Sequence, residues 1–304
     1  MSPPAGIGAD ARAWLMQKSA PLTVHYGRSL QLADGDLPTP ERVTIPTRHG
    51  RVRCEIYRPP TSVGDGPRPV LLHLHGGAFI MRHPRMDDFW TRYLALEAGV
   101  AAIAVDYATA PQARYPVAQE QVYDVLTYVV DHGSALGVDG TRVGIGGFSA
   151  GGQLAAAACL QSIAAGHPRP AFALLGVPSL DVAQEWSDKR PVGTPMLGRG
   201  ILDLVRSTYF RDAARRTEPL ASPLLAPSVA GFPPTMLITA EVDLLRREGD
   251  AFARRLSEVG VAVEHVVVPG HDHYFLDETN APTLLARMAG AVREALVDES
   301  GHSG

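Results

Sequence analysis

The chain has 304 residues, of which 45% are hydrophobic and 20% charged, an ordinary composition for a globular protein. This composition excludes a wholly disordered chain, and a net charge of −4 gives no basic field that would indicate a nucleic-acid partner. No segment approaches the roughly 18 uncharged apolar residues that span a bilayer, so we expect no membrane insertion. The only cysteines, Cys54 and Cys159, cannot form a disulfide framework, which favours a cytoplasmic protein.

Short apolar segments alternate with amphipathic helices along most of the chain. After a helix near 9–19, an antiparallel hairpin is predicted at 41–47 and 51–58, around the turn His49-Gly50. Six apolar runs then predict strands that are buried on both faces, and helical segments with one apolar face lie between them. The strands are predicted at 70–75, 100–106, 143–146, 171–177, 235–240 and 263–268, and the helices at 87–98, 117–131, 150–165, 248–259 and 282–297.

This alternation predicts a single α/β domain over 1–304, with a mostly parallel central sheet, an antiparallel N-terminal hairpin and helices on both faces. Two regions depart from it. Residues 1–40 contain one helix and a connector rich in Pro, Gly and Asp. Residues 181–230 contain a helix near 198–211 that is bracketed by prolines. Long insertions of this kind indicate a lid, a binding element or a flexible loop.

The most informative segment is Gly147-Phe148-Ser149-Ala150-Gly151, which follows a predicted strand and precedes an alanine-rich helix. A strand that turns sharply into a helix needs small residues two positions before and after the apex, because larger side chains would collide. Ser149 at the apex would present its hydroxyl at the sheet edge, close to the positive end of the helix dipole. The pattern favours a nucleophilic serine; a glycine-rich structural turn is the alternative.

The same glycines allow another interpretation, a dinucleotide- or phosphate-binding loop. However, Gly144 and Gly146 are not followed by the third glycine of that motif, and no acidic residue stands about 20 positions on, at the end of a following strand. No Gly-Lys-Ser/Thr occurs in the chain. The sequence therefore disfavours a nucleotide site.

A hydrolytic serine also needs backbone N–H groups that stabilise the oxyanion of the reaction intermediate. The segment His75-Gly76-Gly77-Ala78-Phe79 ends a predicted strand, and its consecutive glycines let the backbone come close. Alone, this segment fits a tight turn equally well. Because two glycine turns follow two parallel strands at their carboxyl ends, together they indicate one catalytic edge of the sheet.

Candidates for the acid and the base of a catalytic triad lie on loops at the same edge. Asp243 follows one predicted strand, and Glu241 and Asp272 are rival acids. Capping a helix is the alternative role for Asp243. His273 follows the next strand, and His271, two residues away, is the rival base. The residues alone leave these alternatives open.

The histidines also allow a zinc site. His73 and His75 share one face of a strand, and with His271 and His273 they could bind a metal ion. The His-x-His-x-Asp-His run of a metallohydrolase is absent, because a glycine pair follows His75. We therefore expect no metal, with His75 holding the oxyanion loop and His73 in the core or supporting the site.

Five segments together resemble the hormone-sensitive-lipase-like branch of the α/β-hydrolase esterases. The segment 75–79 resembles the family's His-Gly-Gly-Gly-Phe motif, with Ala at the last small position, and 106–111 resembles its Asp-Tyr-Arg-Leu-Ala-Pro segment without the arginine. The segment 147–152 resembles the Gly-Asp-Ser-Ala-Gly-Gly elbow, with Phe for Asp. Segments 243–249 and 270–275 resemble those that carry the triad acid and histidine.

This resemblance implies an α/β-hydrolase fold and a catalytic triad of Ser149, Asp243 and His273. It implies three oxyanion donors, the N–H groups of Gly76, Gly77 and Ala150. The implied reaction is hydrolysis of short- to medium-chain carboxylic esters through an acyl-enzyme, without a cofactor. An amidase, a lactonase or a biosynthetic acyl hydrolase of the same fold is the alternative. A non-catalytic receptor would be marked by loss of a triad residue, and none is lost.

Apolar side chains that flank the motifs are the expected walls of the substrate pocket, with ordinary core packing as the alternative; they are Phe79, Ile80, Phe148 and Phe275. In the resemblance, residues 1–40 and 181–217 form a helical cap over the site. Members of this family often form dimers through the last strand and the C-terminal helix, so a homodimer is implied. The other expected partner is a small-molecule ester.

Overall fold

One eight-stranded sheet forms the centre of the part of the chain that the computed structural model describes, which is residues 7–24, 28–33, 39–60, 66–167, 169–189 and 195–298. The strands are β1 (Glu41–Thr47), β2 (Gly50–Tyr57), β3 (Arg68–Leu74), β4 (Ala101–Asp106), β5 (Val138–Phe148), β6 (Phe172–Gly176), β7 (Thr235–Ala240) and β8 (Val263–Val268). Their order across the sheet is β1-β2-β4-β3-β5-β6-β7-β8.

Strand β2 is the antiparallel member of this sheet. It pairs antiparallel with β1, through the tight hairpin in which Thr47 faces Gly50, and antiparallel with β4. All the other neighbouring strands pair in parallel. The structure thus confirms the mostly parallel sheet with an antiparallel N-terminal hairpin, and the parallel strands bring their carboxyl ends to one edge.

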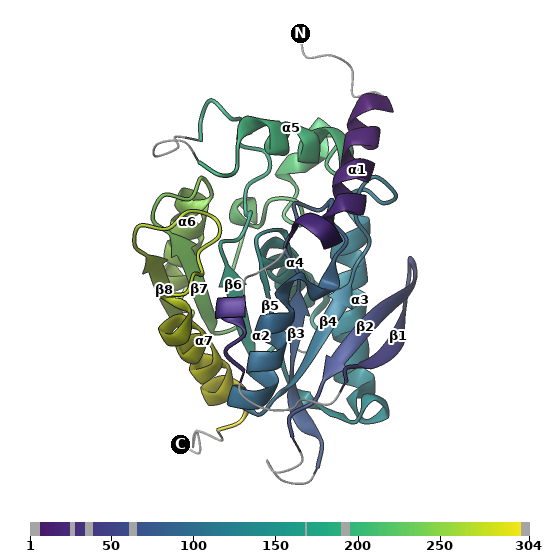
Figure 1. Cartoon of the computed structure of the whole chain (residues 1–304), viewed down its shortest axis with the longest axis vertical. Helices are drawn as coiled ribbons and strands as arrows, with labels where there is room; N and C mark the ends of the chain where they lie inside the picture. Colours follow the sequence, from purple (N-terminus) through teal and green to yellow (C-terminus); the bar gives the residue numbers. More distant parts are fainter. Residues whose placement is uncertain are drawn as a thin grey trace.

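Helices cover both faces of the sheet, as predicted (Figure 1). The described residues form α1 (Ile7–Thr23), α2 (Asp88–Tyr93), α3 (Val117–His132), α4 (Ala150–Ala165), α5 (Arg199–Thr208), α6 (Arg246–Glu258) and α7 (Ala281–Leu296). Buried side chains of α3, α4 and α6 belong to one hydrophobic cluster, and those of α2 and α7 belong to the cluster on the opposite face. In the described part of the chain, no helix combines the length and apolar character needed to cross a membrane.

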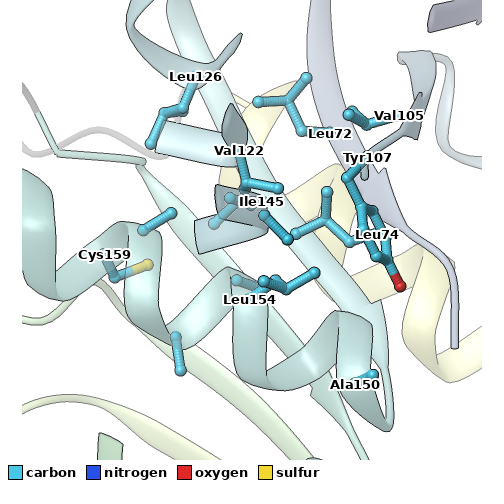
Figure 2. Packing of buried hydrophobic residues seen from close by; sticks show 14 of the residues in the cluster. Leu72, Leu74, Val105, Tyr107, Val122, Leu126, Ile145, Ala150, Leu154 and Cys159 are labelled. Atoms are coloured by element: carbon cyan, nitrogen blue, oxygen red, sulfur yellow. The ribbon is translucent and has the colours of Figure 1, made fainter. Parts of the chain in front are cut away.

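The first cluster fills the space between the sheet and the helices α3 and α4. In Figure 2, Leu72, Leu74 and Ile145 of the sheet lie beside side chains of these helices, among them Val122 and Leu154. All five side chains are buried. Small residues make up most of α4, so this helix can lie close to the sheet and hold the residue before it firmly in place.

Two elements differ from the prediction. The helix expected at 87–98 begins as a 3-10 turn, Pro84–Asp87, continues as α2 and ends as a π-helical turn, Leu94–Ala98. Strand β5 begins at Val138, five residues before the predicted apolar run, because its first residue pairs with Arg68 across an irregularity in the ladder. Neither change moves the carboxyl ends of the strands.

The helices α1 and α5 contact each other beyond one end of the sheet (Figure 1). They belong to the two regions that were expected to form a cap, 1–40 and 181–217. Parts of these regions lie outside the described residues: 1–6, 25–27, 34–38 and 190–194.

Candidate active site

Ser149 occupies the sharp turn between β5 and α4. Its backbone has φ 55° and ψ −114°, a conformation that non-glycine residues rarely adopt. Its N–H donates to the carbonyl of Gly176 at 2.8 Å. A Cβ on Gly151 would lie 1.9 Å from the carbonyl oxygen of Leu74, and one on Gly147 would lie 2.4 Å from the same atom. The small residues around Ser149 are therefore required by the close approach of three backbone segments.

Unusual backbone conformations gather around this turn. The non-glycine residues with positive φ in the described chain are Ser149, Ala78, Phe79 and Val177. Ala78 and Phe79 follow β3, and Val177 follows β6, so all four lie at the carboxyl edge of the sheet. Strained backbone of this kind persists where the surrounding structure holds it, and it is frequent at functional sites.

Three side chains from separate loops meet above this edge. The Nε2 atom of His273 lies 2.8 Å from the Oγ of Ser149, and its Nδ1 lies 3.0 Å from Oδ2 of Asp243. A carboxylate only accepts, so Nδ1 of His273 carries the proton and Nε2 is free to accept one from the serine hydroxyl. The Oδ1 atom of Asp243 also accepts from the N–H of Leu245 at 3.1 Å, which fixes the carboxylate.

The rival acids and base have other partners. Nδ1 of His271 lies 2.7 Å from the carbonyl of Pro269, and its Nε2 lies 3.0 Å from Asp277. Glu241 accepts from the N–H of Gly270 at 2.7 Å. Asp272 accepts from the N–H of Met196 at 2.8 Å and from that of His273 at 2.7 Å. The structure brings Asp243 and His273, and not these rivals, to the serine.

The glycine loop after β3 lies directly against the serine turn. A Cβ on Gly76 would be 3.8 Å from the Cβ of Ser149, and Gly77 has a φ of +112°. A Cβ on Gly77 would lie 2.8 Å from that of Met81, so this position also requires glycine. Ala150 opens α4, and the first N–H groups of a helix lack partners within the helix. Gly76 and Gly77 thus line the same cavity as Ser149, and Ala150 follows Ser149 directly in the chain.

The side chain and the carbonyl group of His75 both make contacts that hold this loop in place. Its Nδ1 donates to the carbonyl of Gly76 at 2.7 Å, and its ring stacks on Tyr107 with 4.4 Å between centroids. The Tyr107 hydroxyl donates to the carbonyl of His75 at 2.7 Å. Burial lowers the pKa of His75 to about 4, so its ring is neutral at neutral pH. Within the described residues, no group of three or more His, Cys, Asp or Glu side chains is arranged to hold a metal ion.

Two cavities meet at Ser149. The first, which we call the cap-side cavity, is about 520 Å³ when the space open to solvent is included. Its walls include Phe79, Ala150 and three residues of α5: Ile201, Leu202 and Val205. The second, the histidine-side cavity, is about 570 Å³ when the space open to solvent is included. Its walls include Gly76, Gly77, Phe148, His273 and Phe275.

The expected wall residues divide between these cavities. Phe79 lines the cap-side cavity, whereas Phe148 and Phe275 line the histidine-side cavity. Ile80 is fully buried in the core and lines neither cavity. Sequence reasoning missed Asp87 and Ile201, which line the histidine-side cavity. The apolar face of the helix predicted at 198–211 could have indicated Ile201, but no local pattern marks Asp87.

An ion pair lies behind the cap-side cavity. Nζ of Lys189, which lines this cavity, is 3.4 Å from Oε2 of Glu248, and both side chains are at least 95% buried. Burial raises the pKa of Glu248 to about 7, although the charge of Lys189 opposes this shift. The pair joins the second expected cap region to the first turn of α6.

Known proteins with similar sequences are esterases. A family described as the α/β-hydrolase fold matches residues 71–277. An ethyl acetate hydrolase of Pseudomonas putida is 32% identical over 94% of this chain and 85% of its own length. An arylesterase of Saccharolobus solfataricus is 30% identical over 78% of this chain and 77% of its own.

Solved structures agree with these relatives. A thermostable esterase from Pseudomonas putida has a TM-score of 0.83 and 30% identity, and the match covers 95% of this chain and 91% of that one. A carboxyl esterase from Tuber melanosporum has a TM-score of 0.79 and 31% identity, over 87% and 89% of the two chains. The chain therefore belongs to the hormone-sensitive-lipase-like branch of the α/β-hydrolase fold family and is a carboxylic ester hydrolase.

Proposed function

We propose that this chain hydrolyses short- to medium-chain carboxylic esters through a Ser-His-Asp triad and an acyl-enzyme. The observation that carries the proposal is the row of contacts from Asp243 through His273 to Ser149, at 3.0 and 2.8 Å. The names of similar proteins, which include acetyl esterases of Salmonella and the ethyl acetate hydrolase of Pseudomonas putida, support the short acyl chain.

In the first half-reaction, Oγ of Ser149 attacks the ester carbonyl carbon while its proton passes to Nε2 of His273. Asp243 keeps the proton of the neutral imidazole on Nδ1 and stabilises the imidazolium that forms. The C–O bond to the alcohol then breaks, and the leaving oxygen takes the proton from Nε2. Water repeats these steps on the acyl-enzyme and releases the acid.

Negative charge develops on the carbonyl oxygen at each attack. The N–H groups of Gly76, Gly77 and Ala150 are the proposed donors to this oxyanion. The N–H groups of Gly76 and Gly77 belong to a loop that His75 and Tyr107 hold in place, and that of Ala150 belongs to the first turn of α4, so none of them needs to rearrange during the reaction. Loss of one such donor typically removes about 3 kcal/mol of transition-state stabilisation.

The position of His273 indicates which cavity holds the alcohol part of the ester and which holds the acyl chain. Because Nε2 must reach the leaving oxygen, the alcohol part of the ester lies on the side of the histidine. His273 lines the histidine-side cavity and does not line the cap-side cavity. We therefore assign the histidine-side cavity to the alcohol and the cap-side cavity to the acyl chain.

The regions 1–40 and 181–217 act as the cap in this proposal. Met16 of α1 lines the histidine-side cavity, and Ile201 of α5 lines both cavities. Nε2 of Gln17 donates to Thr109 at 2.9 Å and to the carbonyl of Ala110 at 3.1 Å, which ties α1 to the loop after β4. Together with 41–180 and 218–304, these elements make one domain.

We also propose a homodimer through β8 and α7. Strand β8 is the last strand of the sheet in the described chain, and Val267 on it is 38% exposed. Light scattering of the full chain tests this proposal, and a monomer at micromolar concentration would contradict it.

A panel of p-nitrophenyl esters from C2 to C12 tests the proposed activity. We expect the highest kcat/KM for the short chains, and labelling of Ser149 by a serine-directed phosphonate. Ser149→Ala and His273→Ala should fold normally and lose nearly all turnover. The matched control is His271→Ala, which should keep its turnover because His271 contacts Pro269 and Asp277 instead of the serine. An inactive His271→Ala beside an active His273→Ala would refute the assignment of the base.

A further inference from the structure

One aspartate joins the second cap region to the loop that carries His273. Asp272 precedes His273 on the loop after β8, and the proposed triad gives it no role. Its Oδ1 atom accepts from the N–H of His273 at 2.7 Å, and its Oδ2 atom accepts from the N–H of Met196 at 2.8 Å. Both donors are backbone groups, and Met196 is 76 positions away in the sequence. Asp272 therefore connects the backbone of the proposed base to the backbone of the cap.

The bond from Met196 to Asp272 holds the start of α5. Met196 precedes this helix by one turn, in which the N–H of Gly198 donates to the carbonyl of Met196 at 3.1 Å. The Met196 side chain is 53% exposed, so its packing contributes little to holding the segment. Within the described part of the chain, the other hydrogen bonds and ion pairs of residues 195–205 join neighbours within 195–210. The bond to Asp272 is thus the polar contact that fixes this end of the helix.

The other end of α5 is fixed by several contacts. The hydroxyl of Tyr209 accepts from the N–H of Ala118 at 3.0 Å and donates to Oε1 of Gln119 at 2.8 Å, and both partners belong to α3. The guanidinium of Arg206 donates to three carbonyls of the segment 182–184, at 2.6 to 3.0 Å. A helix that is firmly fixed at its end and held by one polar contact at its start can pivot when that contact is removed.

The helix α5 forms a wall of the cavity that we assign to the acyl chain. Leu197, which follows Met196 directly, lines the cap-side cavity together with three residues of the helix, Ile201, Leu202 and Val205. Ser149 lines the same cavity, so an acyl chain bound there extends from the serine towards this wall. The position of the start of α5 therefore determines how much room an acyl chain has.

We propose that Asp272 is a positioning residue that limits the length of the acyl chain, because it holds the start of α5 against the loop of His273. This inference rests on the proposed function, since it needs the acyl chain to lie in the cap-side cavity. Asp272 acts through the backbone N–H groups of His273 and Met196 and takes no part in the attack or in the transfer of protons.

A series of p-nitrophenyl esters with acyl chains of two, four, six and eight carbons tests this proposal, because the leaving group stays the same. Asp272→Ala removes the acceptor from the start of α5, so this wall of the cavity can move outward. We expect the ratio of kcat/KM for octanoate to that for acetate to rise about tenfold or more over the wild-type ratio. An unchanged ratio, including one in which turnover of all four esters falls equally, would overturn the proposal, and so would a lower ratio.

Two variants of Met196 separate the effect of its N–H group from that of its side chain. Met196→Pro has no N–H group to donate, whereas Asp272 can still accept from His273. Met196→Pro should therefore raise the ratio as Asp272→Ala does, and the double variant should add little, because both changes remove the same bond. The matched control is Met196→Ala, which keeps the N–H group and should keep the wild-type ratio. A wild-type ratio in Met196→Pro would overturn the proposal.

A second control changes a carboxylate that contacts the same loop without contacting the cap. Glu241 accepts from the N–H of Gly270 at 2.7 Å. The amide of Glu241→Gln can still accept this bond, and we expect the wild-type ratio. A ratio that rises in Glu241→Gln as much as in Asp272→Ala would overturn the proposal, because loosening of the loop alone would then explain the change.

Hydrogen exchange of the folded proteins gives a readout that does not depend on turnover. In Asp272→Ala, backbone amides of residues 196–208 should exchange about tenfold faster, whereas those of α4 should keep their wild-type rates. If the wild-type protein hydrolyses no ester, the proposed function fails, and unchanged exchange at 196–208 would separately overturn the role of Asp272. If Asp272→Ala does not fold, Met196→Pro in the exposed segment before α5 provides both measurements.

Discussion

Replacing Gly151 by alanine should damage both the fold and the reaction. The added Cβ would lie 1.9 Å from the carbonyl oxygen of Leu74 and 2.7 Å from that of His75, whereas real Cβ contacts essentially never fall below 3.0 Å. Both neighbours are backbone atoms, so α4 and the end of β3 must separate by roughly 1 Å. Overpacking of this kind typically costs about 1–3 kcal/mol of stability. A shift of about 1 Å at the reacting atoms can lower turnover about 100-fold.

Urea unfolding and kcat/KM for p-nitrophenyl acetate measure the two effects. The matched control is Gly290→Ala in α7, where an added Cβ meets nothing within 4 Å. This control should gain about 1 kcal/mol, because alanine is the better helix former, and its turnover should not change. Wild-type stability and turnover in Gly151→Ala would refute the reasoning, since the clash distance would then have no consequence.

Three further predictions concern the proposed triad, a buried acid and metal ions. Asp243→Asn should fold normally and lower kcat about 10⁴-fold, because an amide no longer holds the imidazole in the required tautomer; a loss below tenfold would contradict this. Burial raises the pKa of Glu248 from 4.5 to about 7 in the folded protein. Binding of a proton to Glu248 therefore stabilises the folded protein fully below pH 4.5, and this stabilisation is lost as the pH rises through 7. Unfolding free energies should therefore fall by up to about 3 kcal/mol across this window in the wild-type protein relative to Glu248→Gln, and parallel curves would contradict this. Dialysis against EDTA should leave turnover unchanged, because Ser149, His273 and backbone N–H groups supply the proposed chemistry; a loss restored by zinc would contradict it.

The core of the fold could be predicted because its physical causes are local in the sequence. A strand buried on both faces is a short apolar run, and residues 235–240 and 263–268 are strands within the predicted bounds. The serine turn was visible because the approach of Leu74 excludes any side chain at Gly147 and Gly151. Steric requirements of this kind place glycines at a fixed spacing in the sequence, where they can be recognised.

Contacts between residues that are far apart in the sequence produce no such local pattern. Asp87 pairs with His73 across 14 positions, and Lys189 pairs with Glu248 across 59. Each pair forms because elements far apart in the sequence come together in the fold: a strand and a 3-10 turn for His73 and Asp87, and a loop and the first turn of α6 for Lys189 and Glu248. Local sequence also could not decide between His271 and His273 as the base, because they lie only two residues apart on one loop. That prediction depended on the resemblance to a known family.

The strained backbone of Ser149 has a consequence for how the protein can evolve. A non-glycine residue at φ 55° and ψ −114° costs of the order of 1–3 kcal/mol, and glycine would relieve most of this strain. Ser149, to which we assign the nucleophilic attack, is thus a residue that lowers the stability of the fold. Selection for stability alone would therefore favour glycine over serine at position 149.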